Sequence, residues 1–315
     1  MRSSITLAAE ARGRFAKETV VPIDSIKIAL SLAAYGASLS LPHEFDGYYP
    51  PPYGPKAYVY PPDLTNPNRN AFQADESAQE SESEDLLTAF HLERLRAYAS
   101  DKETWREVDA IAFETIPLAR EVKAIRRAVA ALEDELSPEE RKPWWVCTIY
   151  PGGEIPEEHP GGGGGRLGAK DVLAAYFDDV PTATTNRTHK GVRYAVPDAF
   201  GMNCTAMAHV ASAVTAASDA LAETSATRSS FGGSEQPWLV LKPNGGQTYD
   251  MGTHEWGWYG GVTRLEGDEW AKQLGGIVHS AAAKGVWGGI LVGGCCKAGE
   301  EELRLLSKAL QPKLQ

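Results

Sequence analysis

Three cysteines stand in two short motifs that could together bind a metal ion. Cys295 and Cys296 are adjacent and follow two glycines, and Cys204 closes the stretch Gly201-Met-Asn-Cys204. Each motif follows a short apolar run, so the thiols are expected at the ends of two buried strands, where parallel-sheet enzymes carry their catalytic groups. Three thiolates would leave one corner of a tetrahedral zinc ion free, as in catalytic zinc sites. An exogenous thiol bound there would lose its proton near neutral pH and could attack an electrophilic carbon.

The cysteines alone also allow a simpler interpretation. Buried free cysteines behave as small apolar residues and are common in protein cores. Cys147 lies inside an apolar run and is predicted to be such a packing residue. Only four cysteines occur in 315 residues, which does not suit a disulfide framework. We therefore expect free thiols in a reducing compartment.

The elements that must position these groups alternate along the chain. Short, nearly continuous apolar runs are typical of strands covered on both faces. They occupy residues 26–32, 110–113, 144–149, 199–202, 238–241 and 289–292. Apolar residues recur with helical spacing at residues 90–98, 118–136, 207–221, 270–281 and 301–310. This order predicts an α/β fold with a parallel sheet and right-handed crossovers.

Two segments interrupt the alternation. Residues 65–85 are polar and acidic, and residues 151–168 contain the glycine run from Gly161 to Gly165. Both are predicted to be surface loop insertions, near 63–86 and 151–169, within a single domain that spans residues 1–315. The second is either a solvated linker or a flexible lid.

Charge and hydropathy exclude two classes of partner. The formal net charge of −11 is opposite to what phosphate binding needs, so we expect no nucleic-acid partner. The sequence has no apolar stretch of the roughly 18 residues that a membrane span requires, and no apolar signal-peptide core near Met1. We therefore expect a cytoplasmic protein that acts on small molecules, without a membrane partner.

Several motifs together resemble those of the homocysteine S-methyltransferase family. They are Ala34-Tyr-Gly-Ala37, Glu44-Phe-Asp-Gly-Tyr48, Phe90-His-Leu-Glu-Arg-Leu95, Asp109-Ala-Ile-Ala-Phe-Glu-Thr-Ile-Pro117, Gly201-Met-Asn-Cys204, Lys242-Pro-Asn-Gly-Gly246 and Gly293-Gly-Cys-Cys296. They occur in family order across residues 26–297. The resemblance implies a (β/α)8 TIM barrel. It also implies a zinc ion held by Cys204, Cys295 and Cys296, and transfer of a methyl group to the homocysteine thiol, which forms methionine.

The resemblance also suggests how the amino acid is held. An acidic residue at the position of Glu114 binds the homocysteine ammonium in the family; alternatively, Glu114 is an acid that stabilises the following helix N-terminus. Asn203 either hydrogen-bonds the amino acid or holds a loop. His91 is predicted to be structural, and Tyr35 is predicted to belong to a packed loop rather than to a donor pocket. Turn chemistry alone explains Asn244.

The chain departs from the family pattern at its beginning. About six of the eight barrel strands can be found, and the sequence opens inside what resembles the second helix, residues 5–15. We therefore expect an incomplete, N-terminally truncated barrel whose two open edges destabilise it. The favoured donor is a sulfonium, S-methylmethionine or S-adenosylmethionine, with betaine as another possibility. The rival hypothesis is a catalytically inactive truncated paralogue that keeps the metal site. An unrelated barrel hydrolase is disfavoured, because no Gly-x-Ser-x-Gly motif accompanies the cysteines.

Overall fold

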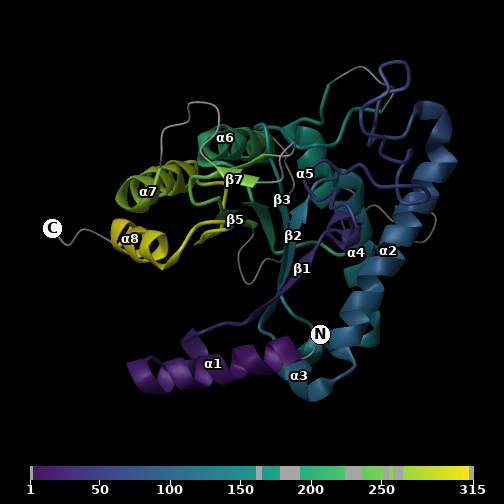
Figure 1. Ribbon diagram of the computed structural model, residues 1–315. Helices are drawn as coiled ribbons and strands as arrows, with labels where there is room; N and C mark the ends of the chain where they lie inside the picture. Colours follow the sequence, from purple (N-terminus) through teal and green to yellow (C-terminus); the bar gives the residue numbers. More distant parts are fainter. Residues whose placement is uncertain are drawn as a thin grey trace.

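A computed structural model of the chain shows an α/β architecture built on a parallel sheet (Figure 1). The structure describes residues 3–160, 165–177, 192–223, 236–250, 255–257 and 265–311. The sheet strands are β1 (Ala29–Ala33), β2 (Ala110–Ile116), β3 (Trp144–Thr148), β4 (Ala199–Asn203), β5 (Trp238–Lys242) and β8 (Ile290–Val292). A separate antiparallel pair consists of β6 (Thr248–Asp250) and β7 (Glu255–Gly257).

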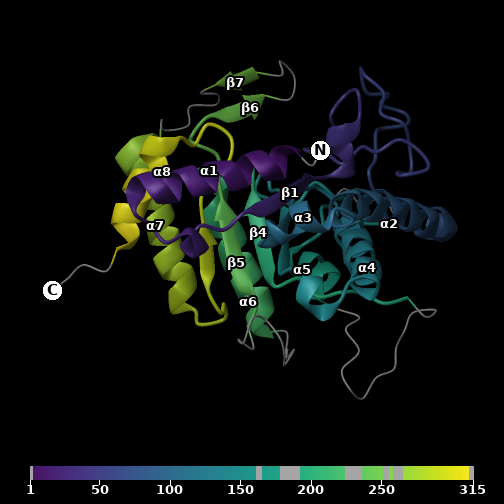
Figure 2. The same ribbon diagram turned by 90° about the horizontal axis from the view of Figure 1, so that it is seen from below.

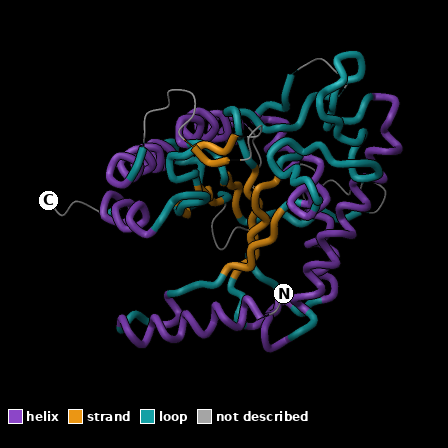
Figure 3. The backbone as a smooth tube through the Cα atoms, in the orientation of Figure 1, coloured by secondary structure: helices purple, strands orange, loops and turns teal. Residues whose placement is uncertain are grey.

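Helices flank the strands (Figure 3). They are α1 (Ser3–Thr19), α2 (Ser77–Ala99), α3 (Lys102–Arg106), α4 (Ala119–Glu135), α5 (Ala169–Phe177), α6 (Met207–Glu223), α7 (Gly267–Ala283) and α8 (Glu300–Leu310). From α4 onward each helix packs against the next one, and α2 packs against α4. This outer layer of helices around parallel strands is the arrangement of a (β/α)8 barrel. Among the described residues, no helix is both long and apolar enough to cross a membrane.

The sheet contains six parallel strands and does not close. Its order follows the chain, from β1 through β5 to β8, and in the described residues β1 and β8 each pair on one side only. The predicted incomplete barrel is therefore confirmed. The helix expected at residues 5–15 is present as α1, which lies below the sheet (Figures 1 and 2). Arg12 of α1 pairs with Glu107 and Asp109, just before β2 begins.

The core forms where the strands are covered on both faces. Val146 and Phe200, register partners on one face of β3 and β4, and Cys147 and Val240, on the other face of β3 and β5, are each at most 1% exposed. This explains why the runs in the sequence are continuously apolar rather than alternating. At the sheet edge, where β8 pairs only with β5 in the described residues, Leu291 is 38% exposed.

The acidic segment before residue 86 corrects one prediction. Residues 77–85 were expected to be loop but form the first turns of α2. Ser83 and Leu87 are fully buried on one face, while Glu84 and Asp85 pair with Arg127 of α4. Polar composition misled the prediction, because it reflects the exposed face of this helix and not the state of its backbone.

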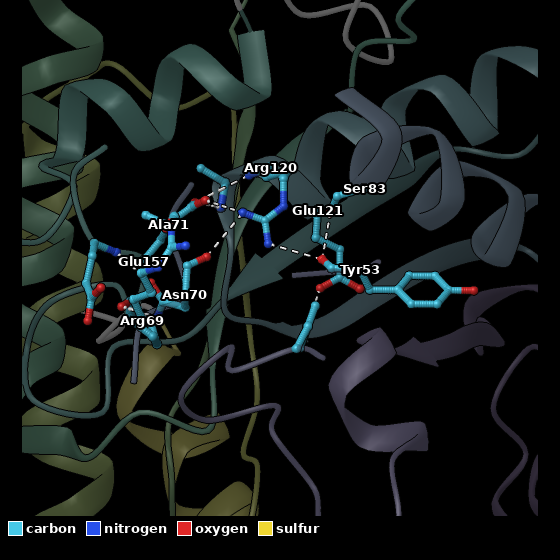
Figure 4. A network of polar contacts seen from close by, with 12 residues as sticks. Tyr53, Arg69, Asn70, Ala71, Ser83, Arg120, Glu121 and Glu157 are labelled. Carbon is cyan, nitrogen blue, oxygen red and sulfur yellow. Dashed lines mark hydrogen bonds and ion pairs between the residues drawn. The ribbon is translucent and has the colours of Figure 1, made fainter. Parts of the chain in front are cut away.

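The segment from residue 151 is also not a simple solvated loop. Its Glu157 is 5% exposed and forms an ion pair with Arg120 of α4, which is 4% exposed (Figure 4). Glu157 also accepts hydrogen bonds from the backbone N–H groups of Ala119 and Arg120, so it acts as an acidic cap on the α4 N-terminus. Gly161 to Gly164, which the lid hypothesis concerns, lie outside the described residues.

Arg120 further connects two segments that are distant in sequence. Its guanidinium donates to the carbonyl oxygens of Asn70 and Tyr53, at 3.3 and 3.4 Å (Figure 4). The side chain of Asn70 in turn donates to the carbonyl of Pro156 and accepts from the N–H of Glu158. The network therefore fastens the segments before α2 and after β3 onto α4.

We expect the substitution Arg120→Met to destabilise the protein by about 3–5 kcal/mol near neutral pH, because it leaves the buried Glu157 carboxylate uncompensated. Burial already raises the pKa of Glu157, and Arg120 opposes that rise. Without Arg120 the folded-state pKa moves further above the unfolded value. The deficit relative to the wild type should therefore be largest above that pKa and shrink as the pH falls through it.

Urea unfolding of both proteins at neutral and mildly acidic pH measures this effect. Glu135→Gln is the matched control, because it breaks an exposed pair with Arg96 and should change stability little. A deficit for Arg120→Met no larger than that of the control would show that the network does not stabilise the fold.

Candidate metal centre

The three predicted ligands lie together at the carboxyl ends of the strands. Cys204 follows β4 directly, and Cys295 and Cys296 come shortly after β8. The Sγ atom of Cys204 lies 2.8 Å from that of Cys295 and 3.7 Å from that of Cys296, and all three sulfurs fall within 4.8 Å of one another. All are free thiols. Among the described residues they form one cluster that could hold a metal ion.

The donor set fits a thiophilic cation such as zinc. Zn–S bonds of about 2.3 Å in a tetrahedron place sulfurs roughly 3.8 Å apart, which matches the separation of Cys204 and Cys296. Cys204 and Cys295 would have to separate by about 1 Å. Hydrogen bonds from Cys204 and Cys296 lower the pKa of Cys295, whereas the contact with Cys295 raises that of Cys204. Cys295 is therefore the most readily ionised of the three thiols, and a bound cation would favour the loss of the proton from each of them.

Strained backbone surrounds the cluster. Cys204 has φ +47°, Thr115 has φ +61° and Lys297 has φ +65°, three of the four non-glycine residues with positive φ in the described part of the chain. Each such conformation costs on the order of 1–3 kcal/mol and persists only where its surroundings impose it. Long-range contacts hold this part of the backbone: the N–H of Thr115 donates to the side chain of Asn203, and the N–H of Gly245 donates to the carbonyl of Cys296, next to Lys297.

Asn203 connects the cluster to β2. Its Oδ1 accepts from the N–H of Thr115 at 2.8 Å, and its Nδ2 donates to the Thr115 hydroxyl at 2.9 Å. The same Nδ2 lies 3.7 Å from the sulfurs of both Cys204 and Cys295. Of the two roles considered for Asn203, this geometry favours holding the loop and the sulfurs. A direct contact with the amino acid stays a prediction.

We therefore expect Asn203→Ala to weaken zinc binding by about 10–100-fold, because groups that orient metal ligands typically contribute that much. Competition with a chromophoric chelator measures the affinity. The control is Asn66→Ala, which changes an exposed asparagine away from the cluster. Unchanged zinc affinity in Asn203→Ala would contradict the positioning role.

Glu114 lies on β2 but not as an isolated carboxylate. It forms an ion pair with Lys242 at the end of β5, and both side chains are 18% exposed. Burial lowers the pKa of Lys242 to about 8, while the nearby Cys295 opposes that shift. The alternative role for Glu114, an acid at the α4 N-terminus, is filled by Glu157 instead. The use of Glu114 for an ammonium stays a prediction.

The remaining sequence candidates are structural. His91 is fully buried and bonds Glu121 at 2.9 Å, and burial lowers its pKa. Tyr35 stacks on Tyr53 with ring centroids 4.1 Å apart, as expected of a packed loop. Cys147 is fully buried in β3, which confirms its packing role. Asn244 is buried, and its carbonyl accepts from the indole of Trp270, so more than turn chemistry holds it in place.

Sequence reasoning missed two residues at this site. Thr115 follows Glu114 and looked like part of a strand, and Lys242 stood in a quoted motif without a role. The signal available for Lys242 was its position, since a charged residue directly after an apolar strand run lies at the carboxyl end where sites form.

A parallel sheet flanked by helices, with thiols gathered at its carboxyl edge, defines a barrel-type enzyme fold with a cysteine cluster that could hold a metal ion. The model of the family described as homocysteine S-methyltransferase matches residues 1–310. The chain therefore belongs to the homocysteine S-methyltransferase family. Comparison with curated protein sequences found no match.

Two crystal structures of the homocysteine methyltransferase MmuM from Escherichia coli are similar to this chain. The metallated form is 19% identical with a TM-score of 0.51, and the oxidised form is 18% identical with a TM-score of 0.53. Each alignment covers 98% of this chain and 69% of the other. At such identity the likeness shows the shared fold.

Proposed function

We propose that the protein is a zinc-dependent methyltransferase that moves a methyl group from a sulfonium donor to the homocysteine thiol and forms methionine. The convergence of Cys204, Cys295 and Cys296 carries this proposal. Family membership supports homocysteine as the acceptor. The similar fold of MmuM, one structure of which is a metallated form, supports the use of a metal. We also propose a cytoplasmic location, since a reducing compartment keeps neighbouring cysteines as the free thiols that a metal site needs.

Each part of the site has a defined task in this proposal. A bound zinc ion would supply the Lewis acidity that lowers the pKa of the acceptor thiol. The cysteines hold that ion, and Asn203 orients two of them. Glu114 pairs with the ammonium of homocysteine and orients its sulfur toward the donor. Such positioning contributes much of the rate enhancement when the leaving group is already good.

The chemical step balances without an organic cofactor. The carbon–sulfur bond of the donor breaks as the acceptor sulfur forms a bond to the same methyl carbon, and the donor leaves as a neutral thioether. The acceptor proton passes to solvent before the transfer. A sulfonium such as S-methylmethionine or S-adenosylmethionine is the proposed donor, because its leaving group needs no protonation.

The rival function is that of an inactive paralogue that keeps the metal site. The open edges of the six-stranded sheet favour this second candidate, because part of a closed barrel wall is not formed by the described residues. Zinc content and methionine formation from each donor separate the two. About one zinc ion per chain with turnover supports the enzyme, and the same zinc content without turnover supports the paralogue.

A further inference from the structure

The ion pair between Glu114 and Lys242 crosses the concave side of the sheet. Glu114 is on β2 and Lys242 on β5, and β3 and β4 lie between them in the sheet order. Adjacent strands are about 4.8 Å apart, so strands three positions apart would lie roughly 14 Å apart in a flat sheet. The two side chains meet only because the sheet is rolled. The pair therefore faces the barrel interior rather than the surrounding helices.

Two other contacts place the thiols on the same side. Asn203 at the end of β4 reaches Thr115 on β2, and Cys204 after β4 meets Cys295 after β8, so each contact passes over an intervening strand. Thr115 directly follows Glu114, and Lys242 is the register partner of Asn203. The Glu114 carboxylate, the Lys242 ammonium and the sulfur cluster therefore share a single interior surface at the carboxyl end of the sheet.

The backbone of Lys242 also connects it to the sulfurs. The next residue, Pro243, accepts a hydrogen bond from the N–H of Cys295 at 2.8 Å. The Lys242 stem runs beside Gly293, where an added Cβ would lie 3.5 Å from Lys242 Cγ. The backbone that follows Lys242 therefore contacts the loop that carries Cys295 and Cys296. The Lys242 side chain is mostly shielded from water.

We propose that Glu114 and Lys242 together form a receptor for the zwitterionic end of an α-amino acid, with Lys242 binding the α-carboxylate. This inference rests on the proposed function. In the free protein the two charges neutralise each other, which avoids leaving either one uncompensated in a poorly hydrated site. A bound amino acid replaces this pair by two pairs, its ammonium with Glu114 and its carboxylate with Lys242, so the charge balance is unchanged. Lys242 thereby makes the site selective for thiols that carry a carboxylate.

The test compares Lys242→Met with the wild-type zinc-loaded protein by titration calorimetry of three thiols. The ligands are L-homocysteine, 3-aminopropane-1-thiol, which lacks the carboxylate, and 4-sulfanylbutanoate, which lacks the amine. The wild type should bind homocysteine at least about tenfold more tightly than 3-aminopropane-1-thiol, because a hydrogen bond between the charged Lys242 and the carboxylate contributes about that factor to the affinity. In Lys242→Met this ratio should fall towards one. Lys242→Arg should retain most of it.

The design separates this inference from the proposed function. If homocysteine fails to bind the zinc-loaded wild type, the proposed function fails. If it binds, and Lys242→Met keeps the full preference over 3-aminopropane-1-thiol, then Lys242 does not bind the carboxylate and the inference is overturned. The inference would also be overturned if Lys242→Met bound homocysteine and 3-aminopropane-1-thiol more tightly than the wild type, with an unchanged ratio of the two affinities. That result would mean that Lys242 only competes with the ligand's ammonium for Glu114. Zinc content and the thermal melt of each variant establish that the fold and the cluster are intact.

Discussion

Replacing Cys204 by serine should abolish stoichiometric zinc binding and reduce methionine formation by at least about a hundredfold. The sulfur of Cys204 lies 2.8 Å from that of Cys295 and 3.7 Å from that of Cys296, so its loss removes one of the three ligands that the cluster offers. A serine hydroxyl does not ionise near neutral pH and is a poor zinc ligand. Without the cation, a thiol of pKa about 8.5 is only a few per cent ionised, and the loss of positioning adds to that deficit.

The measurement is metal content by atomic spectroscopy together with turnover on the same preparation. Cys147→Ser is the matched control, because it makes the same chemical change at a fully buried cysteine that is not one of the three clustered thiols. A hydroxyl in that apolar position should cost about 1–3 kcal/mol of stability but leave zinc content unchanged. Full zinc occupancy in Cys204→Ser, or in Cys295→Ser and Cys296→Ser, would contradict the ligand assignment.

The second large effect is expected for Glu114→Gln. The isosteric amide removes the negative charge that we assign to the homocysteine ammonium, and a hydrogen bond between charged groups contributes about 1.5–3 kcal/mol. The KM for homocysteine should therefore rise by about 10–100-fold. Zinc content should stay at the wild-type level, because Glu114 is not part of the cysteine cluster.

The two homocysteine analogues used to test Lys242 also test the role of Glu114. Glu114→Gln should lose the preference for homocysteine over 4-sulfanylbutanoate, the thiol without an amine, and keep some preference over 3-aminopropane-1-thiol. Glu84→Gln is the control, since Glu84 pairs with Arg127 on the outer helices. An unchanged KM for homocysteine with a normal zinc content would exclude Glu114 as the ammonium partner.

Much of the architecture could be read from local pattern. Each of the six apolar runs corresponds to a strand of the parallel sheet, and the predicted helices at residues 118–136 and 207–221 are found within a few residues of α4 and α6. Strands buried on both faces need continuous apolar residues, and helices need a repeating apolar face, so these patterns are visible without a structure. The same reasoning failed at residues 77–85, where an exposed helical face looks like a loop.

The family motifs, the six parallel strands and the three thiols that follow two of them can be read from the sequence, because each depends on residues close together in the chain. Which side chains meet, in contrast, depends on the fold. The rolled sheet brings Lys242 to Glu114 and Asn203 to Thr115, and the packing of α4 brings Arg120 to Glu157. These partners are separated by many residues, and their contact depends on how far the strands curve and how the helices pack, which no local pattern encodes.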